Sequence, residues 1–315
     1  MQSISGLIAP YRTVRTRLQD FPGKKVLVLE GGGMRGIFLV GVLQAFTDRG
    51  YFPWHTIIGT SAGALVGTVY AARQVHLARD IFFSDLLSGE FICLTNIFRR
   101  EKHILNLDWM VDNFIAQEGG LDFRRLRTTA CPVIIVTTSF YQHAPLRPMY
   151  LDTRCDDVLL ALKASAAIPF LYRNFVPYKD EMLMDGSVCD PLPYKKALDM
   201  GFAEKDILVV TTRPRGYRKE RESFWAKKLY EAHYKEEQYQ YLISALNDHY
   251  GKYNQLLDEL EQDHPGIEVI YPPADFKVNR LTRSEDKILS GFSQGVRAAR
   301  SYLYGLRDQA PPHED

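Results

Sequence analysis

Residues 24–40 read KKVLVLEGGGMRGIFLV, and residues 56–72 read TIIGTSAGALVGTVYAA. In each stretch a short apolar run meets glycines and then continues into a second apolar run. The first runs, at 26–29 and 56–58, have the length and the aliphatic content of buried parallel strands. The second runs predict helices. Strand, glycine turn and helix, occurring twice in succession, indicate a parallel α/β sheet.

Outward from these stretches the same criteria predict a larger α/β domain. The first two helices are expected at 34–49, ended by Gly50, and at 64–72. Further strands are expected at 132–136, 149–151, 182–184, 207–210 and 268–271. Further helices are expected at 107–116, 158–167, 224–262 and 284–306. We therefore expect an α/β fold with a mostly parallel central sheet flanked by helices and with a helical C-terminal extension.

Composition excludes several classes of protein. The chain has 315 residues, 46% of them hydrophobic, and 39 basic residues balance 38 acidic ones. This balance does not indicate a nucleic-acid partner. The four cysteines lack metal-ligand spacing, so we expect reduced and mostly buried thiols in a reducing compartment.

The first residues lack the charged and apolar regions of a secretory signal. No run of 18 apolar residues occurs, so no transmembrane helix is expected. We therefore expect a cytoplasmic location, with any membrane contact peripheral.

Gly59-Thr60-Ser61-Ala62-Gly63 is a G-x-S-x-G pattern between a predicted strand and a predicted helix. In this position the pattern is typical of a nucleophile elbow, a tight turn that holds the serine in a strained conformation above the sheet. The alternative is a glycine-flanked turn whose serine caps the helix. The position between strand and helix favours Ser61 as a nucleophile.

Residues 31–36 read GGGMRG and open the first helix, so their backbone N–H groups can face an anion. The same six residues satisfy the dinucleotide pattern G-x-G-x-x-G, which requires an acidic residue about 20 positions later at the end of the next strand. That strand leads instead into Gly59 and Ser61. We therefore favour an oxyanion hole formed by the N–H groups of Gly32, Gly33 and Arg35, each typically worth about 3–4 kcal/mol in the reaction barrier.

Asp185-Gly186-Ser187 follows the apolar strand predicted at 182–184. Ligands of open parallel sheets bind along the carboxyl ends of the strands. Because the serine turn and the glycine loop also follow strands, we expect the three segments to converge on one rim. Asp-Gly alone is an ordinary turn, so Asp185 is a candidate general base only through this convergence.

The order of GGGMRG, G-x-S-x-G and a distant Asp-Gly resembles the patatin-like phospholipase family, as does ASAAIP at 164–169. The resemblance covers roughly residues 24–212. Ser187 departs from the family, in which Gly or Ala usually follows the Asp-Gly. Serine is small, so we expect the turn to persist.

The resemblance implies a bacterial patatin-like serine acyl hydrolase with a three-layer α/β/α fold. Such an enzyme would hydrolyse acyl esters of lipids through a Ser61–Asp185 dyad, without histidine, metal or organic cofactor. Gly32, Gly33 and Arg35 would supply the oxyanion hole. The remaining motif residues would be Gly31, Gly36, Gly59, Gly63 and Gly186.

The expected organisation has four parts. These are an N-terminal segment 1–23, a catalytic α/β domain 24–212, a mainly helical extension 213–307 that packs on the core, and a disordered tail 308–315. The C-terminal helices are rich in tyrosine and suit either a wall of the acyl pocket or a dimer surface. The sequence leaves the oligomeric state open.

Two other functions remain as alternatives. An α/β-hydrolase triad would join Ser61 and an aspartate to His233, His249 or His264. The serine turn comes only about 35 residues after the first strand begins, which leaves little room for the strands that usually precede it. These histidines also lie in or beside a charged helical region, where a solvated surface position is more common. The other alternative is a non-catalytic acyl-lipid binding protein of the same fold, which would need neither Ser61 nor Asp185.

Residues 213–228 hold seven basic and two acidic side chains together with Phe224 and Trp225. Basic charge with interfacial aromatic residues suits an anionic bilayer. A solvated loop that leads into a helix is the simpler interpretation, and we favour it. Peripheral membrane contact is the alternative.

Overall fold

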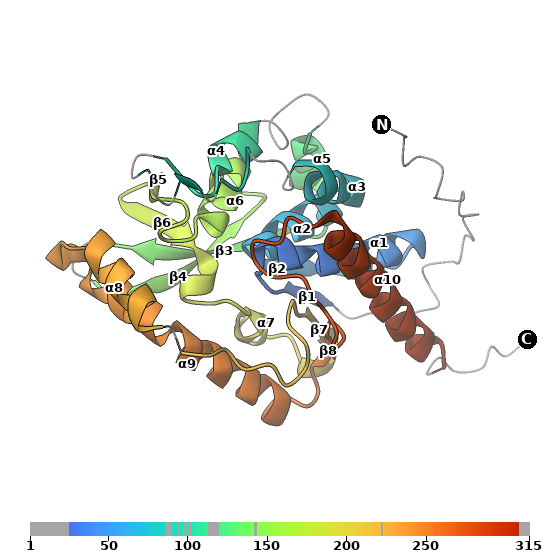
Figure 1. The fold of residues 1–315 in the computed structure, drawn as a ribbon. Helices are drawn as coiled ribbons and strands as arrows, with labels where there is room; N and C mark the ends of the chain where they lie inside the picture. Colours follow the sequence, from blue (N-terminus) through green and yellow to red (C-terminus); the bar gives the residue numbers. More distant parts are fainter. Residues whose placement is uncertain are drawn as a thin grey trace, which may run out of the picture.

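Figure 1 shows the fold in a computed structural model of the protein. The structure describes residues 25–85, 90–93, 95–96, 99, 102–112, 120–141, 144–221 and 223–308. The predicted segment 1–23 and nearly all of the predicted tail 308–315 lie outside these residues.

The centre of the molecule is an eight-stranded mixed sheet. Five strands run parallel in the order β3 (Val133–Phe140), β2 (Thr56–Thr60), β1 (Val26–Leu29), β7 (Ile207–Val210) and β8 (Glu268–Ile270). Three strands are antiparallel to their neighbours: β4 (Arg147–Asp152) and β6 (Glu181–Asp185) on β3, and β5 (Val176–Tyr178) on β6. The predicted α/β class with a mostly parallel sheet is confirmed.

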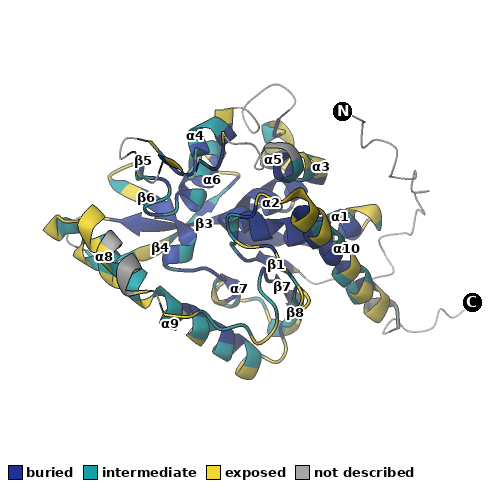
Figure 2. Cartoon of the chain, in the orientation of Figure 1, coloured by how far each residue is buried: buried dark blue, intermediate teal, exposed yellow. Residues whose placement is uncertain are grey.

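Helices cover both faces of the sheet, and Figure 2 shows its central strands β1, β2 and β7 as buried. Leu27 and Leu29 of β1 point to one core, whereas Val26 and Val28 point to the other, as alternation along a strand requires. Residues of the first core come from α1 (Ile37–Asp48), α2 (Ala62–Ala71), α6 (Val158–Ala166) and α10 (Glu285–Asp308). Residues of the second core come from α7 (Tyr194–Asp199) and α9 (Gln240–Gln262).

Shorter elements complete the described chain. The α-helices are α3 (Val75–Asp80), α4 (Leu107–Met110), α5 (Phe123–Thr128) and α8 (Phe224–His233). A π-helical turn, η4 (Ile81–Asp85), follows α3. The 3-10 turns are η3 (Gly33–Gly36), η7 (Gly186–Val188), η8 (Glu204–Asp206) and η9 (Glu237–Tyr239).

The stretch predicted as helical at 224–262 is helical over most of its length, but it is not continuous. The chain forms α8 and α9 with a break at residues 234–236, where Tyr234 is buried in a third apolar cluster and its hydroxyl accepts the Phe170 N–H at 3.0 Å. Helical periodicity does not reveal this break, because the contact that holds Tyr234 comes from a distant part of the chain. Of the helix predicted at 107–116, residues 113–116 lie outside the described part.

The two strands that carry the candidate site meet end to end beside β3. The first half of β3 pairs with β2 and the second half with β6, while β4 occupies the opposite edge of β3. Thr60, the last residue of β2, lies opposite Val136, and Asp185, the last residue of β6, lies opposite Thr137. The expected convergence of Ser61 and Asp185 is therefore observed, but the expected reason is wrong, because β6 approaches antiparallel from the other direction.

The C-terminal region is built into the same sheet and core. β8 pairs with β7, α9 lies along the second face of the sheet, and α10 lies against α1 (Figure 1). Ile288, Ala299 and Leu303 of α10 belong to the same core as β1. Helices α9 and α10 thus pack on the core, whereas the domain boundaries themselves remain predictions.

Helices α1 and α10 approach closely because glycines face each other across the contact. A Cβ atom added at Gly295 would lie 2.2 Å from the Phe38 carbonyl oxygen. Gly295→Ala is therefore expected to destabilise the fold by about 1–3 kcal/mol through overpacking. Urea denaturation followed by circular dichroism measures the change.

Gly305 of the same helix provides the control, because it is exposed and an added Cβ would meet nothing within 4 Å. Gly305→Ala is expected to stabilise the protein by roughly 0.5–1 kcal/mol, since alanine restricts the unfolded chain. Equal effects of the two substitutions would contradict a close α1–α10 contact.

Candidate active site

Ser61 lies in a strained turn between β2 and α2. Its backbone angles are φ 54° and ψ −122°, a conformation that non-glycine residues rarely adopt. The turn is tight on both sides: a Cβ atom at Gly59 would lie 2.6 Å from Gly63 O, and one at Gly63 would lie 2.4 Å from Leu29 O. The Ser61 side chain makes no capping hydrogen bond to α2, which argues against the alternative of a simple helix cap.

Ser165 stabilises this turn through a hydrogen bond to its backbone. Its hydroxyl accepts the Ser61 N–H at 2.8 Å and donates to Val136 O at 2.6 Å. Ser165 is fully buried near the end of α6. The segment 164–169, singled out only as a resemblance, thus contacts the backbone of the candidate nucleophile. Asp185 N also donates to Ala167 O in this segment, at 3.0 Å.

Asp185 has one occupied and one unoccupied carboxylate oxygen. Oδ1 accepts the Ser187 N–H at 2.7 Å. Oδ2 is buried and has no hydrogen-bond partner among the described residues. Burial raises the pKa of the Asp185 carboxyl. The hydrogen bond from Ser187, the positive charge of Arg280 and the Ser61 side chain each act to lower it, but burial is the larger effect. A raised pKa makes the carboxylate a stronger base, and Oδ2 is available to accept a proton.

Some backbone N–H groups of the glycine loop donate hydrogen bonds within the protein, and others do not. Gly31 N donates weakly to Pro191 O at 3.5 Å, and Arg35 N donates to Gly32 O at 3.2 Å. The N–H groups of Gly32 and Gly33 have no acceptor in the described part of the chain. Gly33 has φ 56°, a value that favours glycine.

The other motif glycines lie at close contacts around the site. A Cβ atom at Gly36 would lie 2.9 Å from the Ala62 side chain, and one at Gly186 would lie 2.3 Å from Val136 O. The glycine loop therefore packs against the start of α2, and the Asp185 turn packs against β3.

Two cavities meet at Ser61, and they differ in polarity. The apolar cavity extends from Ser61 between the helices of the first face. It is lined by Gly33, Met34, Ser61, Ala62, Leu65, Phe82, Phe91, Ile92, Leu105, Leu107, Met110, Leu162, Ala166, Ile168 and Arg280. The polar cavity contains both Ser61 and Asp185. It is lined by Glu30, Gly31, Gly32, Gly33, Arg35, Ser61, Ile168, Asp185, Ser187, Pro191, Arg213, Tyr217, Lys219, His249, Tyr253 and Arg280.

The C-terminal region lines the polar cavity, which agrees with the interpretation of its helices as a pocket wall, although the sequence did not indicate Tyr253 or Arg280. His249 and Tyr253 come from α9, and Arg280 comes from the loop before α10. Their only sequence signal is the i, i+4 spacing of His249 and Tyr253, which places both on one helix face. The Tyr253 hydroxyl donates to Glu30 at 2.5 Å, directly before the glycine loop.

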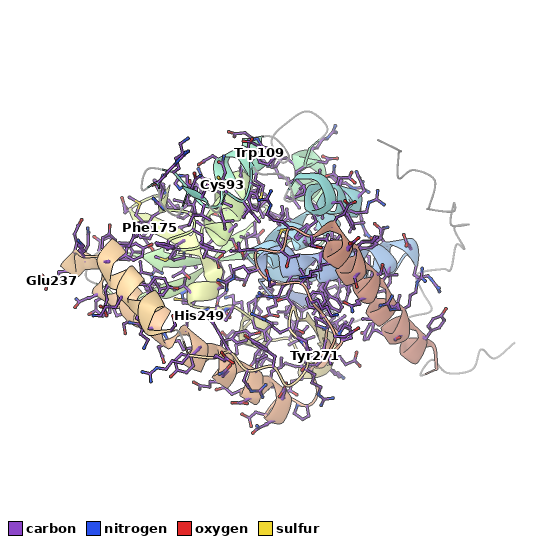
Figure 3. All side chains as sticks on the ribbon, viewed as in Figure 1. Cys93, Trp109, Phe175, Glu237, His249 and Tyr271 are labelled. Atoms are coloured by element: carbon purple, nitrogen blue, oxygen red, sulfur yellow. The ribbon has the colours of Figure 1, made fainter. Side chains whose placement is uncertain are left out.

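His249 is held by two hydrogen bonds on α9 (Figure 3). Its Nε2 lies 2.7 Å from Ser187 O, and its Nδ1 lies 2.5 Å from the Lys219 ammonium. Burial, with the Lys219 charge, lowers the pKa of His249 to about 3. We therefore assign the neutral tautomer with the proton on Nε2. The expectation of a solvated surface position is wrong for His249.

The described residues contain no cluster of three His, Cys, Asp or Glu side chains suited to a metal ion. All four cysteines are free. Cys131 is buried but Cys155 is exposed, so the expectation of mostly buried thiols is wrong for Cys155.

The fold and the site define a class: an α/β protein in which a strained serine, a buried carboxylate and a glycine-rich loop line one cavity. The family model described as Patatin-like phospholipase matches residues 27–198, and the chain belongs to that family. A second model, described as a domain of unknown function (DUF6363), matches residues 239–309. The predicted family is confirmed.

Relatives of this chain include YjjU of Escherichia coli, named as an uncharacterized protein, which is 29% identical over 80% of this chain and 69% of its own length. Triacylglycerol lipase ptl3 of Schizosaccharomyces pombe is 23% identical over 59% of this chain and 44% of its own length. Mouse patatin-like phospholipase domain-containing protein 7 is 28% identical over 56% of this chain but only 13% of its own length. The crystal structure of VipD from Legionella pneumophila is similar in fold, with a TM-score of 0.50, 14% identity, and coverage of 92% of this chain and 67% of VipD.

Proposed function

We propose that this protein is a lipid acyl hydrolase that cleaves carboxylic esters with Ser61 as nucleophile and Asp185 as general base. The observation that carries the proposal is the unoccupied, buried Oδ2 of Asp185 in the cavity that also contains the strained Ser61. Family membership and relatives named as phospholipase and lipase support the reaction class.

The reaction would proceed in two acyl-transfer steps. Ser61 Oγ attacks the ester carbon while its proton passes to Asp185 Oδ2. The tetrahedral intermediate collapses, the proton returns to the departing alkoxide, and an acyl-enzyme remains. Water then attacks the acyl-enzyme with Asp185 again as base, which releases the fatty acid and restores Ser61.

The oxyanion of each intermediate would bind the N–H groups of Gly32 and Gly33. These amides lack acceptors in the described chain, as an oxyanion hole requires before substrate binds. The Arg35 amide already donates to Gly32 O, so we assign it to stabilising the turn. The acyl chain would occupy the apolar cavity, whose aliphatic and aromatic lining suits a hydrocarbon.

Fluorophosphonate labelling tests the proposal, with the adduct detected by intact mass. One adduct on the folded protein is expected, because an activated serine displaces fluoride from the reagent. A non-catalytic lipid binder would give no adduct. It would also gain nothing from a strained serine, whose backbone conformation costs of the order of 1–3 kcal/mol.

His249→Gln separates the dyad from a Ser-His-Asp triad. Both ring nitrogens of His249 are engaged away from Ser61, and its pKa of about 3 makes it a poor base. We expect the labelling rate to fall by no more than roughly 10-fold, through displacement of the Ser187 turn. A loss on the order of 10⁴-fold or more would establish a triad instead.

Peripheral membrane contact remains a proposal. Within the described residues no helix is both long and apolar enough to cross a bilayer. Part of the basic stretch at 213–228 makes contacts within the protein. Arg218 pairs with Asp258 and Glu261, and Arg213 and Lys219 line the polar cavity. The side chains of Phe224 and Trp225 lie outside the described part. Sedimentation with anionic vesicles at low salt tests the contact, and no binding would exclude it.

A further inference from the structure

The C-terminal region contacts the glycine loop at two separate points. This region, residues 239–309, matches the family model of unknown function and contains α9, β8 and α10. One contact comes from α9 and the other from the loop before α10. Both act on the loop whose Gly32 and Gly33 N–H groups are the proposed oxyanion donors. The two contacts therefore indicate what this region does in the protein.

Tyr253 connects α9 to the start of the glycine loop. Its side chain is 6% exposed, and its hydroxyl donates at 2.5 Å to Oε1 of Glu30, the residue before Gly31. Glu30 is itself buried and directly follows β1. A buried carboxylate oxygen without a donor is unfavourable, so this hydrogen bond fixes the Glu30 side chain relative to α9.

The other carboxylate oxygen of Glu30 joins the glycine loop to the end of β7. Oε2 accepts the Thr212 N–H at 2.5 Å. The Thr212 hydroxyl lies 3.0 Å from both Oε2 and the Gly31 carbonyl oxygen, so its single proton can be donated to either. A Cβ atom at Gly32 would lie 2.7 Å from the same hydroxyl. The start of the loop is thus fixed by β1, by Thr212 and by Tyr253.

The loop before α10 contacts the middle of the glycine loop. The Arg280 carbonyl oxygen accepts the Met34 N–H at 3.1 Å, and a Cβ atom at Gly33 would lie 2.7 Å from that oxygen. Buried Thr282 stabilises the turn that presents this carbonyl, since its hydroxyl accepts the Asn279 N–H at 2.8 Å. The position of the glycine loop therefore depends on the position of the Arg280 carbonyl.

Apolar packing makes α9 a fixed support for the Tyr253 contact. Tyr253, Leu257 and Leu260 belong to the same core as Val26 and Val28 of β1. Spacings of four and three residues place the three side chains on one face of the helix. One core thus holds both α9 and the strand that leads into the glycine loop.

We propose that the C-terminal region 239–309 is a positioning element of the active site, in which Tyr253 and the Arg280 carbonyl hold the glycine loop in the geometry that binds the oxyanion. This inference rests on the proposed hydrolase function and gives its oxyanion hole a support. Such donors lower the reaction barrier only if they are held in place before the reaction. Tyr253 acts through Glu30, so it is a positioning residue.

Tyr253→Phe tests the first contact, because it removes the hydroxyl and retains the ring in the core. With 4-nitrophenyl hexanoate as substrate, we expect kcat to fall by about 10–100-fold and KM to change by less than about 3-fold, since a displacement of about 1 Å can cost about 10²-fold in rate. The value of kcat is taken per active site, counted as fluorophosphonate adducts after complete labelling. Misfolded protein then does not lower it.

Tyr250→Phe is the matched control for this substitution. Tyr250 also lies on α9, but its hydroxyl has no hydrogen-bond partner among the described residues and it does not line the polar cavity. We expect its kcat to equal that of the parent. Thr282→Val tests the second contact independently, and it keeps the test available if Tyr253→Phe does not fold. It should lower kcat per active site in the same way.

Hydrogen exchange separates the support from the reaction, because it needs no substrate. The Met34 and Arg35 amides donate hydrogen bonds in the parent. In Tyr253→Phe and Thr282→Val they should exchange at least about 10-fold faster, through local opening of the loop, while exchange in β3 stays the same.

Three results would overturn the inference even if the protein hydrolyses esters. They are unchanged exchange of the Met34 and Arg35 amides, equal acceleration throughout β3, and unchanged kcat per active site. The second and third results would mean that these contacts contribute to general stability alone. Faster exchange confined to the loop, in a protein whose parent neither labels nor hydrolyses, would support the positioning role and refute the proposed function.

Discussion

Ser61→Ala is expected to abolish fluorophosphonate labelling and to reduce ester hydrolysis by about 10⁴-fold or more. The alanine protein lacks the oxygen that forms the acyl-enzyme, and no neighbouring group replaces it in the proposed mechanism. The methyl group fits the same turn, so the folded structure should persist. Intact-mass labelling and a hydrolysis assay on the same preparations measure the two effects.

Ser244→Ala is the matched control for this substitution. Ser244 is exposed on α9, so the same chemical change should leave labelling and hydrolysis unaltered. An adduct that persists in Ser61→Ala would mean that another residue is the nucleophile. Peptide mapping of that adduct would then identify it.

Asp185→Asn is expected to slow labelling and hydrolysis by about 10²–10⁴-fold, the usual contribution of a general base. The asparagine oxygen can still accept the Ser187 N–H, but the amide nitrogen that replaces Oδ2 cannot accept a proton. In the parent protein the labelling rate should fall as pH drops through the Asp185 pKa. Because burial raises that pKa, this loss should occur at higher pH than for an ordinary aspartate.

The same substitution is expected to increase stability. With its pKa raised, the folded state binds a proton more readily than the unfolded state, so this carboxyl lowers stability as pH rises through the window between the two pKa values. Above that window Asp185→Asn removes a buried charge, and its melting temperature at pH 7.5 should exceed that of the parent. An asparagine protein that is less stable and fully active would refute the role of Asp185 as a base.

Much of the fold followed from local pattern. The strand at residues 26–29 and the glycines around Ser61 predict parallel strands and tight turns, because apolar runs of strand length must be buried and only glycine allows these close contacts. The family motifs selected Ser61 and Asp185 as candidates. The direction of β6 was not predictable in this way, since an apolar strand has the same composition whichever way it runs.

The C-terminal region shows more clearly what the sequence pattern could not predict. Its helices were predicted from periodicity, and a pocket wall was one of two interpretations of them. The sequence could not choose between these, because His249 and Arg280 reach the cavity through the packing of α9 and the hydrogen bond between the Arg280 carbonyl and Met34 N–H. Ser165 is a similar case, since its hydrogen bond to the Ser61 amide joins residues 104 positions apart.

The sequence alone determined which residues carry the candidate chemistry and the class of fold that presents them. The tertiary structure decided their electrostatics: the burial that raises the Asp185 pKa, the two engaged nitrogens of His249, and the arginines that face the polar cavity. The physical reason is that covalent order fixes side-chain chemistry and local conformation, whereas desolvation and charge–charge interactions depend on which distant segments pack together.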